Sequence, residues 1–273
     1  MKNRFIVLID FSPYSAHLLQ FASEWSKKAN AELLLVHRTF PATPALVEVE
    51  IKREIVSIAN REALVKLTSF SNEILNEQEN VKLYVSEENL LTVLPRLLSE
   101  PFNNLLFLGL KGTGILKKLF VGSVAVDVID HIHSLTVLLP KKPEHYSCES
   151  ILVAVQKEYP LNTAEFDRLL ELANHDIQHI NFFSITDESS KEFEESEKYL
   201  KELKQLYSYH ASVSYELYKS DVVIPTLKEI IAQKKNQFLV VQKGSRMFLD
   251  QVFRTFVINE LAYEGETPLI VVP

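Results

Sequence analysis

The chain has 273 residues, of which 47% are hydrophobic and 24% charged, enough apolar material for one large domain or two of ordinary size. Its formal net charge of −7 argues against nucleic acid or an anionic membrane surface as the main partner, because both repel an acidic protein. Cys148 is the sole cysteine, which excludes an internal disulfide and a thiolate metal cluster. The apolar runs are far shorter than the roughly 20 residues of a membrane helix. The first residues lack the pattern of a secretory signal, so we expect a cytoplasmic protein.

Short apolar runs of strand length alternate with stretches of helical periodicity along the whole chain. In the first half, strands are expected over 5–10, 33–37, 81–85, 105–108 and 134–140. The segments between them predict a helix after Pro13, a long polar–apolar helix, a short helix that contains Pro95 and a helix that opens at Gly122-Ser123. The second half repeats this order, with strands expected over 151–156, 179–183, 213–217, 238–241 and 267–273.

This alternation predicts parallel sheets that are covered by helices on both faces. We therefore predict an α/β protein of two tandem domains, each an open five-stranded parallel sheet with helices on both faces. The domains are expected over residues 1–140 and 147–273. A charged, proline-containing linker is expected at 141–146.

The strongest local signal is a spaced set of glycines that follows the apolar run 105–108. Gly109, Gly112, Gly122 and Ser123 form the pattern G-x2-G-x9-G-S. Any one of these glycines alone is more typical of a turn or a helix cap. As a set, between a strand and the start of a helix, they predict a phosphate-binding loop, because glycine admits close backbone approach and the N–H groups at a helix start face an anion.

Three separated features resemble the universal stress protein family. They are the opening strand that ends in Asp10-Phe11-Ser12, the second strand that ends in Val36-His37, and the glycine pattern. The resemblance covers essentially the whole chain, as a tandem protein of two such domains, and it is stronger over residues 1–140. It implies a Rossmann-like fold of the adenine-nucleotide α-hydrolase type, with an ATP site at the carboxyl ends of the strands.

The residues that the resemblance implies for nucleotide binding lie at strand ends or around the glycine loop. They are Leu8, Ile9, Asp10, Arg38, Leu108, Gly109, Gly112, Gly122, Ser123 and Val124. Asp10 is implied to contact the nucleoside, with Leu8 and Ile9 beside it in the pocket wall. The position of Leu108 is implied to lie near the base.

The same resemblance assigns the loop to the sugar and phosphates of ATP. Gly109 and Gly112 are implied to bring the backbone close to the ribose and the phosphates. Gly122, Ser123 and Val124 are implied to hold the phosphates, through the serine hydroxyl and the backbone N–H groups. Mg²⁺ is a candidate bridge between the phosphates.

Two positions leave alternatives open. An acid at a strand end, as at Asp10, can accept hydrogen bonds from a nucleoside or can cap the following helix. The residue after His37, which is usually a small aliphatic in binding members of the family, is Arg38 here. A long cation at this place can stack on a base, reach a phosphate or fill the pocket.

The second half lacks the glycine pattern. An offset of 133 residues, which superposes the two final strands, places side chains at all the key positions. Gln242, Ser245 and Thr255 stand where Gly109, Gly112 and Gly122 are, Phe256 replaces Ser123, and Gln156 replaces Asp10. We therefore predict a degenerate copy that does not bind nucleotide and that packs on the first domain as an internal pseudo-dimer.

No catalytic or metal site is predicted. His131 and His133, even with Asp127, fall short of a zinc ligand set. No P-loop, dinucleotide fingerprint or Ser-His-Asp order is present. The leading hypothesis is thus an ATP-binding stress or signalling protein, not an enzyme, although slow ATP hydrolysis stays open. The alternative is a scaffold that binds protein partners and no nucleotide, and in either case exposed strand edges leave a homodimer open.

Overall fold

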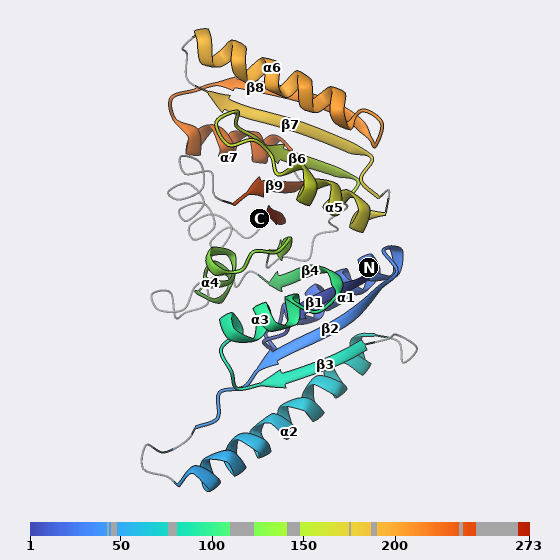
Figure 1. Cartoon of the computed structure of the whole chain (residues 1–273), viewed down its shortest axis with the longest axis vertical. Helices are drawn as coiled ribbons and strands as arrows, with labels where there is room; N and C mark the ends of the chain where they lie inside the picture. Colours follow the sequence, from blue (N-terminus) through green and yellow to red (C-terminus); the bar gives the residue numbers. More distant parts are fainter. Residues whose placement is uncertain are drawn as a thin grey trace.

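The computed structural model describes residues 1–42, 44, 48–75, 81–109, 123–140, 148–174, 176–186, 190–234, 237–243 and 267–273. Within these residues the chain forms a ten-stranded sheet with the order β3-β2-β1-β4-β5-β10-β9-β6-β7-β8 (Figure 1). The first five labels belong to the first half of the chain and the last five to the second half, so each half contributes a contiguous block of strands.

The first half supplies nine elements in chain order. They are β1 (Lys2–Leu8), α1 (Ser15–Lys28), β2 (Ala31–Arg38), α2 (Val49–Ile74), β3 (Val81–Ser86), α3 (Leu90–Leu98), β4 (Phe102–Gly109), α4 (Ser123–His131) and β5 (Thr136–Leu139). All strand pairs within this block are parallel. The predicted five-stranded parallel sheet of the first half is confirmed.

The described part of the second half repeats the same strand order. Its elements are β6 (Ser150–Ala154), α5 (Thr163–Ala173), β7 (His179–Thr186), α6 (Ser190–Tyr207), β8 (Ser212–Lys219), α7 (Val223–Gln233), β9 (Phe238–Gln242) and β10 (Leu269–Val272). Its strand pairs are parallel as well. The predicted linker at 141–146 lies outside the described residues, so the domain limits stay a prediction.

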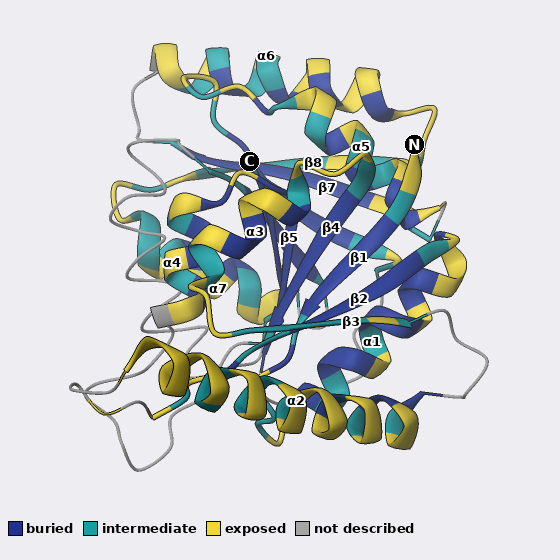
Figure 2. Ribbon diagram, turned by 60° about the horizontal axis from the view of Figure 1, so that its bottom comes forward, coloured by how far each residue is buried: buried dark blue, intermediate teal, exposed yellow. Residues whose placement is uncertain are grey.

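The strands read as continuous apolar runs because helices cover both faces of the sheet. One core contains Leu19 of α1, Leu67 of α2, Phe166 of α5 and Leu203 of α6. The core on the opposite face is built from α3, α4 and α7. Figure 2 shows the central strands as the most buried part of the molecule. Because each core takes residues from both halves, the two predicted sheets fold around shared cores.

The two blocks of strands join edge to edge. β5 and β10 pair in antiparallel fashion, with Val137 opposite Ile270, and this is the antiparallel pair between named strands of the described chain. The fold class is therefore as predicted, and the joint makes one continuous sheet out of the two.

The helices α1 and α5 also meet across this joint. Trp25 donates its indole N–H to the carbonyl oxygen of Leu172 at 3.0 Å, and Asn174 donates to the carbonyl oxygen of Lys28 at 2.6 Å. Lys28 also forms an ion pair with Asp176 at 2.7 Å. The halves are thus held together by helix contacts as well as by the strand pair.

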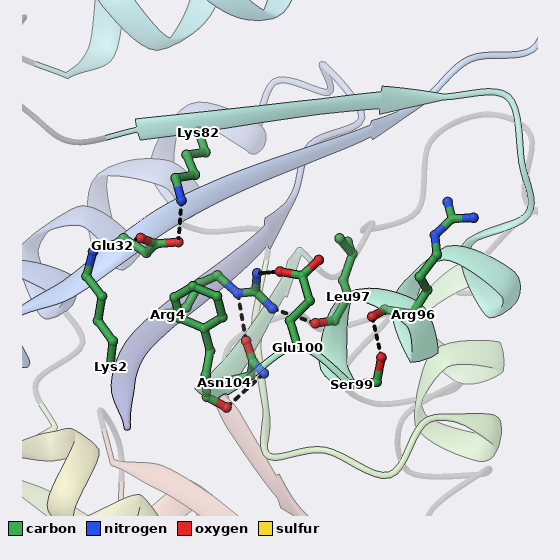
Figure 3. Close-up of polar contacts among 10 residues, drawn as sticks. Lys2, Arg4, Glu32, Lys82, Arg96, Leu97, Ser99, Glu100 and Asn104 are labelled. Carbon is green, nitrogen blue, oxygen red and sulfur yellow. Dashed lines mark hydrogen bonds and ion pairs between the residues drawn. The ribbon is translucent and has the colours of Figure 1, made fainter.

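A polar network lies under the amino ends of the first-half strands (Figure 3). Arg4, which is 3% exposed, donates to Asn104 Oδ1 at 2.8 Å, to Glu100 at 2.6 Å and to the carbonyl oxygen of Leu97. The ring of Phe102 lies 4.1 Å from its guanidinium carbon. A buried arginine is stable only when its donors are satisfied in this way.

A second buried charge lies beside it in the same figure. The carboxylate of Glu32 accepts from Lys2 at 3.0 Å and from Lys82 at 3.2 Å. Burial alone would raise the pKa of Glu32, but the hydrogen bonds from the two lysines outweigh it and hold the pKa below its usual value. This carboxylate therefore stays charged at neutral pH.

Candidate functional site

The carboxyl ends of β1 and β4 lie side by side at the point where the strand order of the first half reverses. From β1 the chain passes through α1 to β2 on one side, whereas β4 pairs with β1 on the other, with Val7 opposite Phe107. Asp10 follows β1 and Gly109 ends β4, so the structure brings these two predicted residues to the same edge of the sheet. Open α/β sheets bind ligands at such a reversal point.

Gly109 ends β4, and its described neighbours would accept a side chain there. A β-carbon built on this residue would meet the Leu18 side chain at 3.9 Å, which is an ordinary van der Waals contact. Its backbone conformation is also open to other residues, because its φ lies outside the left-handed region. The described neighbours therefore do not require glycine here.

Asp10 stabilises the turn between β1 and α1. One carboxylate oxygen, Oδ1, accepts from the Ser12 N–H at 2.9 Å and from the Ser15 hydroxyl at 2.9 Å. The first of these bonds forms an Asx turn before the helix. The predicted alternative of a helix cap is wrong, because the N-cap of α1 is Tyr14 and no side chain caps this helix, and the nucleoside contact stays a prediction.

Phe11 holds an unusual backbone conformation directly after Asp10. Its φ of 56° lies in the left-handed region, which costs a non-glycine residue about 1 kcal/mol or more. Its ring packs against His37 at 4.5 Å and Phe70 at 5.7 Å, and the Lys66 ammonium lies 4.1 Å from the ring centre. These contacts hold the strained turn in place.

The rings of Phe11, His37 and Phe70 form an aromatic wall on the β1–β2 side of the candidate site. His37 at the end of β2 is hydrogen-bonded through Nδ1 to the carbonyl oxygen of Ile9 at 2.8 Å. Lys66 and Phe70 come from α2, far along the chain from β1. Neither Lys66 nor Phe70 is among the predicted site residues, and no signal in the sequence pairs them with Phe11.

The remaining predicted residues are distributed around this edge. Ile9 and Leu108 are buried in the cores on opposite faces of the sheet, at 3% and 2% exposure, and Leu8 is half-buried. Val124 in the first turn of α4 is 48% exposed, and Ser123 begins that helix. The Ser123 side chain, Gly112 and Gly122 lie outside the described part of the chain, so their roles stay predictions.

Arg38 reaches toward β3. Its Nε donates to the carbonyl oxygen of Glu87 at 3.4 Å, and its guanidinium lies 4.6 Å from the Phe40 ring centre. Because β3 lies on the far side of β2 from β1, these contacts direct Arg38 away from Gly109. Whether it takes part in binding stays a prediction, but here it does not fill the space between β1 and β4.

A further hydrogen-bond chain ties α2 to the same end of β2 and β3. Thr39 donates to Asn60 at 2.6 Å, and Asn60 donates to Glu87 at 2.8 Å. The bond from Asn60 is the main cause that lowers the pKa of Glu87. The part of the candidate site beside Arg38 is therefore built from α2 and from the residues that follow β2 and β3.

The second half closes the equivalent place with a side chain. Gly109 pairs with Leu139, and Gln242 pairs with Val272, so the offset of 133 residues holds in the structure. Gln242 accepts a hydrogen bond from the Asn162 N–H and donates to the carbonyl oxygen of Pro160 at 2.9 Å. Its amide thus bridges the end of β9 to the loop after β6, where the first half has Gly109.

Replacing Gln242 with alanine is expected to lower the free energy of unfolding by about 1 kcal/mol, because the Asn162 N–H and the Pro160 carbonyl lose their partner. Gln242→Glu keeps an acceptor for Asn162 but sets a carboxylate oxygen against the Pro160 carbonyl oxygen, so it should not restore the parent stability. Urea denaturation of both variants measures the difference. Equal stability of Gln242→Ala and the parent chain would contradict the bridging role.

The described ranges contain no group of three or more His, Cys, Asp and Glu side chains that could hold a metal ion. Over the same ranges, no helix has the length and apolar character needed to cross a membrane. His131 bonds through Nδ1 to the backbone carbonyl oxygen of Asp127 at 2.8 Å, one turn back in α4.

The family model of the universal stress proteins matches residues 1–140, which is just over half of the chain. The chain belongs to the universal stress protein family. The matched residues contain β1 to β5 and the whole glycine pattern, so the predicted resemblance is confirmed for the first half. A search of curated proteins finds no match.

Solved structures show the same fold over both halves of this universal stress protein. A universal stress protein from Archaeoglobus fulgidus is 13% identical, with a TM-score of 0.69 over 100% of this chain and 98% of that one. A functionally unknown protein from Pseudomonas aeruginosa is 14% identical, with a TM-score of 0.58 over 99% of this chain and 92% of that one. The cytoplasmic domain of a prokaryotic cation chloride cotransporter is 11% identical, with a TM-score of 0.57 over 99% and 95%. At these identities the likeness shows the fold alone.

Proposed function

We propose that this universal stress protein binds ATP, with Mg²⁺ between the phosphates, at one site in its first half. The observation that carries the proposal is the contrast between the two halves. The end of β4 carries Gly109, which has no side chain, whereas the end of β9 carries Gln242, whose side chain bridges to the neighbouring loop. This contrast supports a nucleotide site in the first half and none in the second.

The elements around Gly109 suit an anionic ligand. Ala125 and Val128 anchor α4 in the same core as Leu108, which fixes the start of this helix against the first-half sheet. The N-terminus of a helix carries partial positive charge and free N–H groups, so it favours phosphate. The glycines at 112 and 122 would let the preceding loop approach that phosphate closely.

The proposed role is binding rather than turnover. In this role the protein responds to ATP during stress and passes its state to protein partners. Such a signal would start in the first half and reach the second through the shared cores and the β5–β10 pair. No group in the proposed site is assigned as a catalytic base.

Isothermal titration of ATP with Mg²⁺ into the purified protein tests the proposal. We expect one site per chain in the parent protein. Gly122→Asp should weaken binding at least tenfold, because it puts a side chain and a negative charge where phosphate is expected. Thr255→Asp puts the same side chain at the equivalent position of the second half and should leave the affinity unchanged. Absence of heat in a folded parent protein, or equal affinity of Gly122→Asp, would overturn the proposal.

Two variants of Asp10 separate its role in the turn before α1 from ligand binding in the same titration. Asp10→Asn keeps an oxygen for Ser12 and Ser15 and should preserve the fold. Asp10→Ala removes the acceptor and should also lower stability by about 1 kcal/mol. Weaker ATP binding in both variants would support a direct contact, whereas normal binding by Asp10→Asn would leave the turn as its function.

One observation favours the scaffold as the second candidate. Asp10 already uses Oδ1 for two hydrogen bonds within its own turn, and Arg38 turns toward β3. A chain without nucleotide would keep both arrangements. A native mass spectrum of freshly purified protein distinguishes the candidates, because retained nucleotide adds mass and a scaffold shows the mass of the chain alone.

A further inference from the structure

The C-terminal end of α4 is contacted by a side chain of the second half. Lys243 directly follows β9, and its ammonium nitrogen donates to the carbonyl oxygen of Ile132 at 3.4 Å. Ile132 is buried and directly follows α4, and its own N–H is bonded to the Val128 carbonyl oxygen at 2.8 Å. Figure 1 shows α4 where the two halves meet. A lysine of the second half thus reaches the end of a first-half helix.

The backbone of Lys243 is well anchored, so its side chain starts from a fixed point. Its N–H donates to the carbonyl oxygen of Val272 in β10 at 2.7 Å. The preceding residue, Gln242, pairs with Val272 in the sheet and bonds through its side chain to the loop after β6. The contact with α4 is therefore made from an ordered part of the second half.

The charges at this end of α4 explain why a cation is favourable there. The last turn of a helix carries partial negative charge on its free carbonyl groups, and Asp130 adds a full negative charge to the same turn. Burial lowers the pKa of Lys243, and the nearby Asp130 carboxylate partly opposes this shift, because it favours the ammonium form. Lys243 thus offsets the charge of the helix end and of an acid that the helix dipole disfavours.

The helix α4 also packs into a core that the two halves share. Its residues Ala125, Val128 and Ile129 belong to the same cluster of buried side chains as Leu239 and Val271 of the second half. The helix has nine residues, so its two ends lie only about 12 Å apart. A short helix that is held along one side and at its last turn keeps its first turn in a defined place.

The first turn of α4 is the part of the proposed nucleotide site that needs this precision. Ser123 and Val124 open the helix, and the phosphates of ATP are proposed to bind there. Hydrogen bonds from N–H groups to phosphate depend on distance and direction, so a small shift of the helix weakens them. A contact at the last turn therefore bears on the affinity at the first.

We propose that Lys243 is a positioning residue, supplied by the second half, for the phosphate end of the nucleotide site in the first half. It holds the last turn of α4 at Ile132 and Asp130 and thereby sets the place of the first turn. The inference rests on the proposed function, because the role that it assigns is toward the phosphates of ATP. It gives the second half a part in nucleotide binding without a site of its own.

Isothermal titration of the full chain with ATP and Mg²⁺, and separately with adenosine, tests this role. Lys243→Met removes the ammonium group and keeps most of the apolar stem. It should weaken ATP binding about fivefold and leave the adenosine affinity unchanged, because adenosine has no phosphate to place at α4. Lys243→Arg keeps a cation and should restore the parent affinity for ATP. Lys219→Met, at an exposed position of the edge strand β8, is the matched control and should bind ATP normally.

Hydrogen–deuterium exchange without nucleotide separates this inference from the proposed function. The amides of residues 128–132 should exchange about fivefold faster in Lys243→Met than in the parent chain, and at the parent rate in Lys219→Met. Unchanged exchange in Lys243→Met, unchanged ATP affinity, or an equal loss of ATP and adenosine affinity would overturn this inference and leave the proposed function standing. A folded parent chain that binds no ATP would overturn both.

Discussion

Replacement of Trp25 with alanine is expected to lower the free energy of unfolding by about 4 kcal/mol. Trp25 is 4% exposed, and its ring contacts Phe5 at 6.0 Å and Phe107 at 5.6 Å between centroids. It also touches Phe238 of the second half at 6.4 Å and donates to the carbonyl oxygen of Leu172. Truncation leaves a large cavity at the joint between the halves and removes a buried hydrogen bond.

Denaturation with urea, followed by circular dichroism, measures this loss, because Trp25 is the sole tryptophan and its fluorescence disappears with the mutation. Trp25→Phe serves as the control. It keeps an aromatic ring in the core but lacks the N–H for Leu172, so we expect a loss of only about 1–2 kcal/mol. A loss below about 1 kcal/mol for Trp25→Ala would show that the joint does not depend on this side chain.

The second large effect is expected at Arg4. Arg4→Met should cost about 3 kcal/mol, because it leaves the Asn104 side-chain oxygen and the Leu97 carbonyl oxygen without a buried donor. Methionine retains much of the apolar bulk of the arginine stem, so the loss reports the polar contacts and not a cavity. Asn104 also accepts from Arg168 of the second half through its backbone oxygen at 2.7 Å, so the damage lies close to the joint.

Glu100→Gln distinguishes the two parts of the Arg4 network. Glu100 has a side chain that is 45% exposed, so the ion pair with Arg4 is partly screened by water. We expect a loss of less than about 1 kcal/mol for this variant. Thermal and urea unfolding of both variants provide the comparison. If Glu100→Gln were as damaging as Arg4→Met, the ion pair and not the buried hydrogen bonds would carry the stability.

These two sites bear on function because both lie at or near the joint between the halves. The first half carries the proposed nucleotide site, and the second half has Gln242 where the first half has Gly109. The second half completes the cores around Trp25 and Phe238 whether or not it binds a ligand. It is therefore a structural partner of the first half.

Much of the fold was predictable because its signals are local. Each strand is a short apolar run between polar turns, and a strand that is buried on both faces must read in this way. The repeat of this pattern predicted the two blocks of five parallel strands, and the structure confirms both. The substitution of Gly109 by Gln242 in the second half was also visible, because a strict offset of 133 residues relates the last strands.

The site was predictable only in part. The sequence placed Asp10 and Gly109 at strand ends, and the parallel topology brings them to one edge. It left open whether Asp10 caps a helix, and the structure shows instead that Asp10 holds the turn before α1 through Ser12 and Ser15, while Tyr14 is the N-cap. The direction of Arg38 depends on Glu87 and Phe40, which no local pattern pairs with it.

The sequence by itself thus determined the helices and strands, and that the strands run parallel within each half. It also determined the family and which half keeps the glycine pattern, since all of these depend on residue type and spacing. Only the tertiary structure decided how the halves meet. The antiparallel pairing of β5 with β10, the contact of Trp25 with Phe238 and the aromatic wall at Phe11 all join residues that are distant in the chain. Such contacts form only when the sheet and its helices are assembled, because they depend on which surfaces are brought together in space.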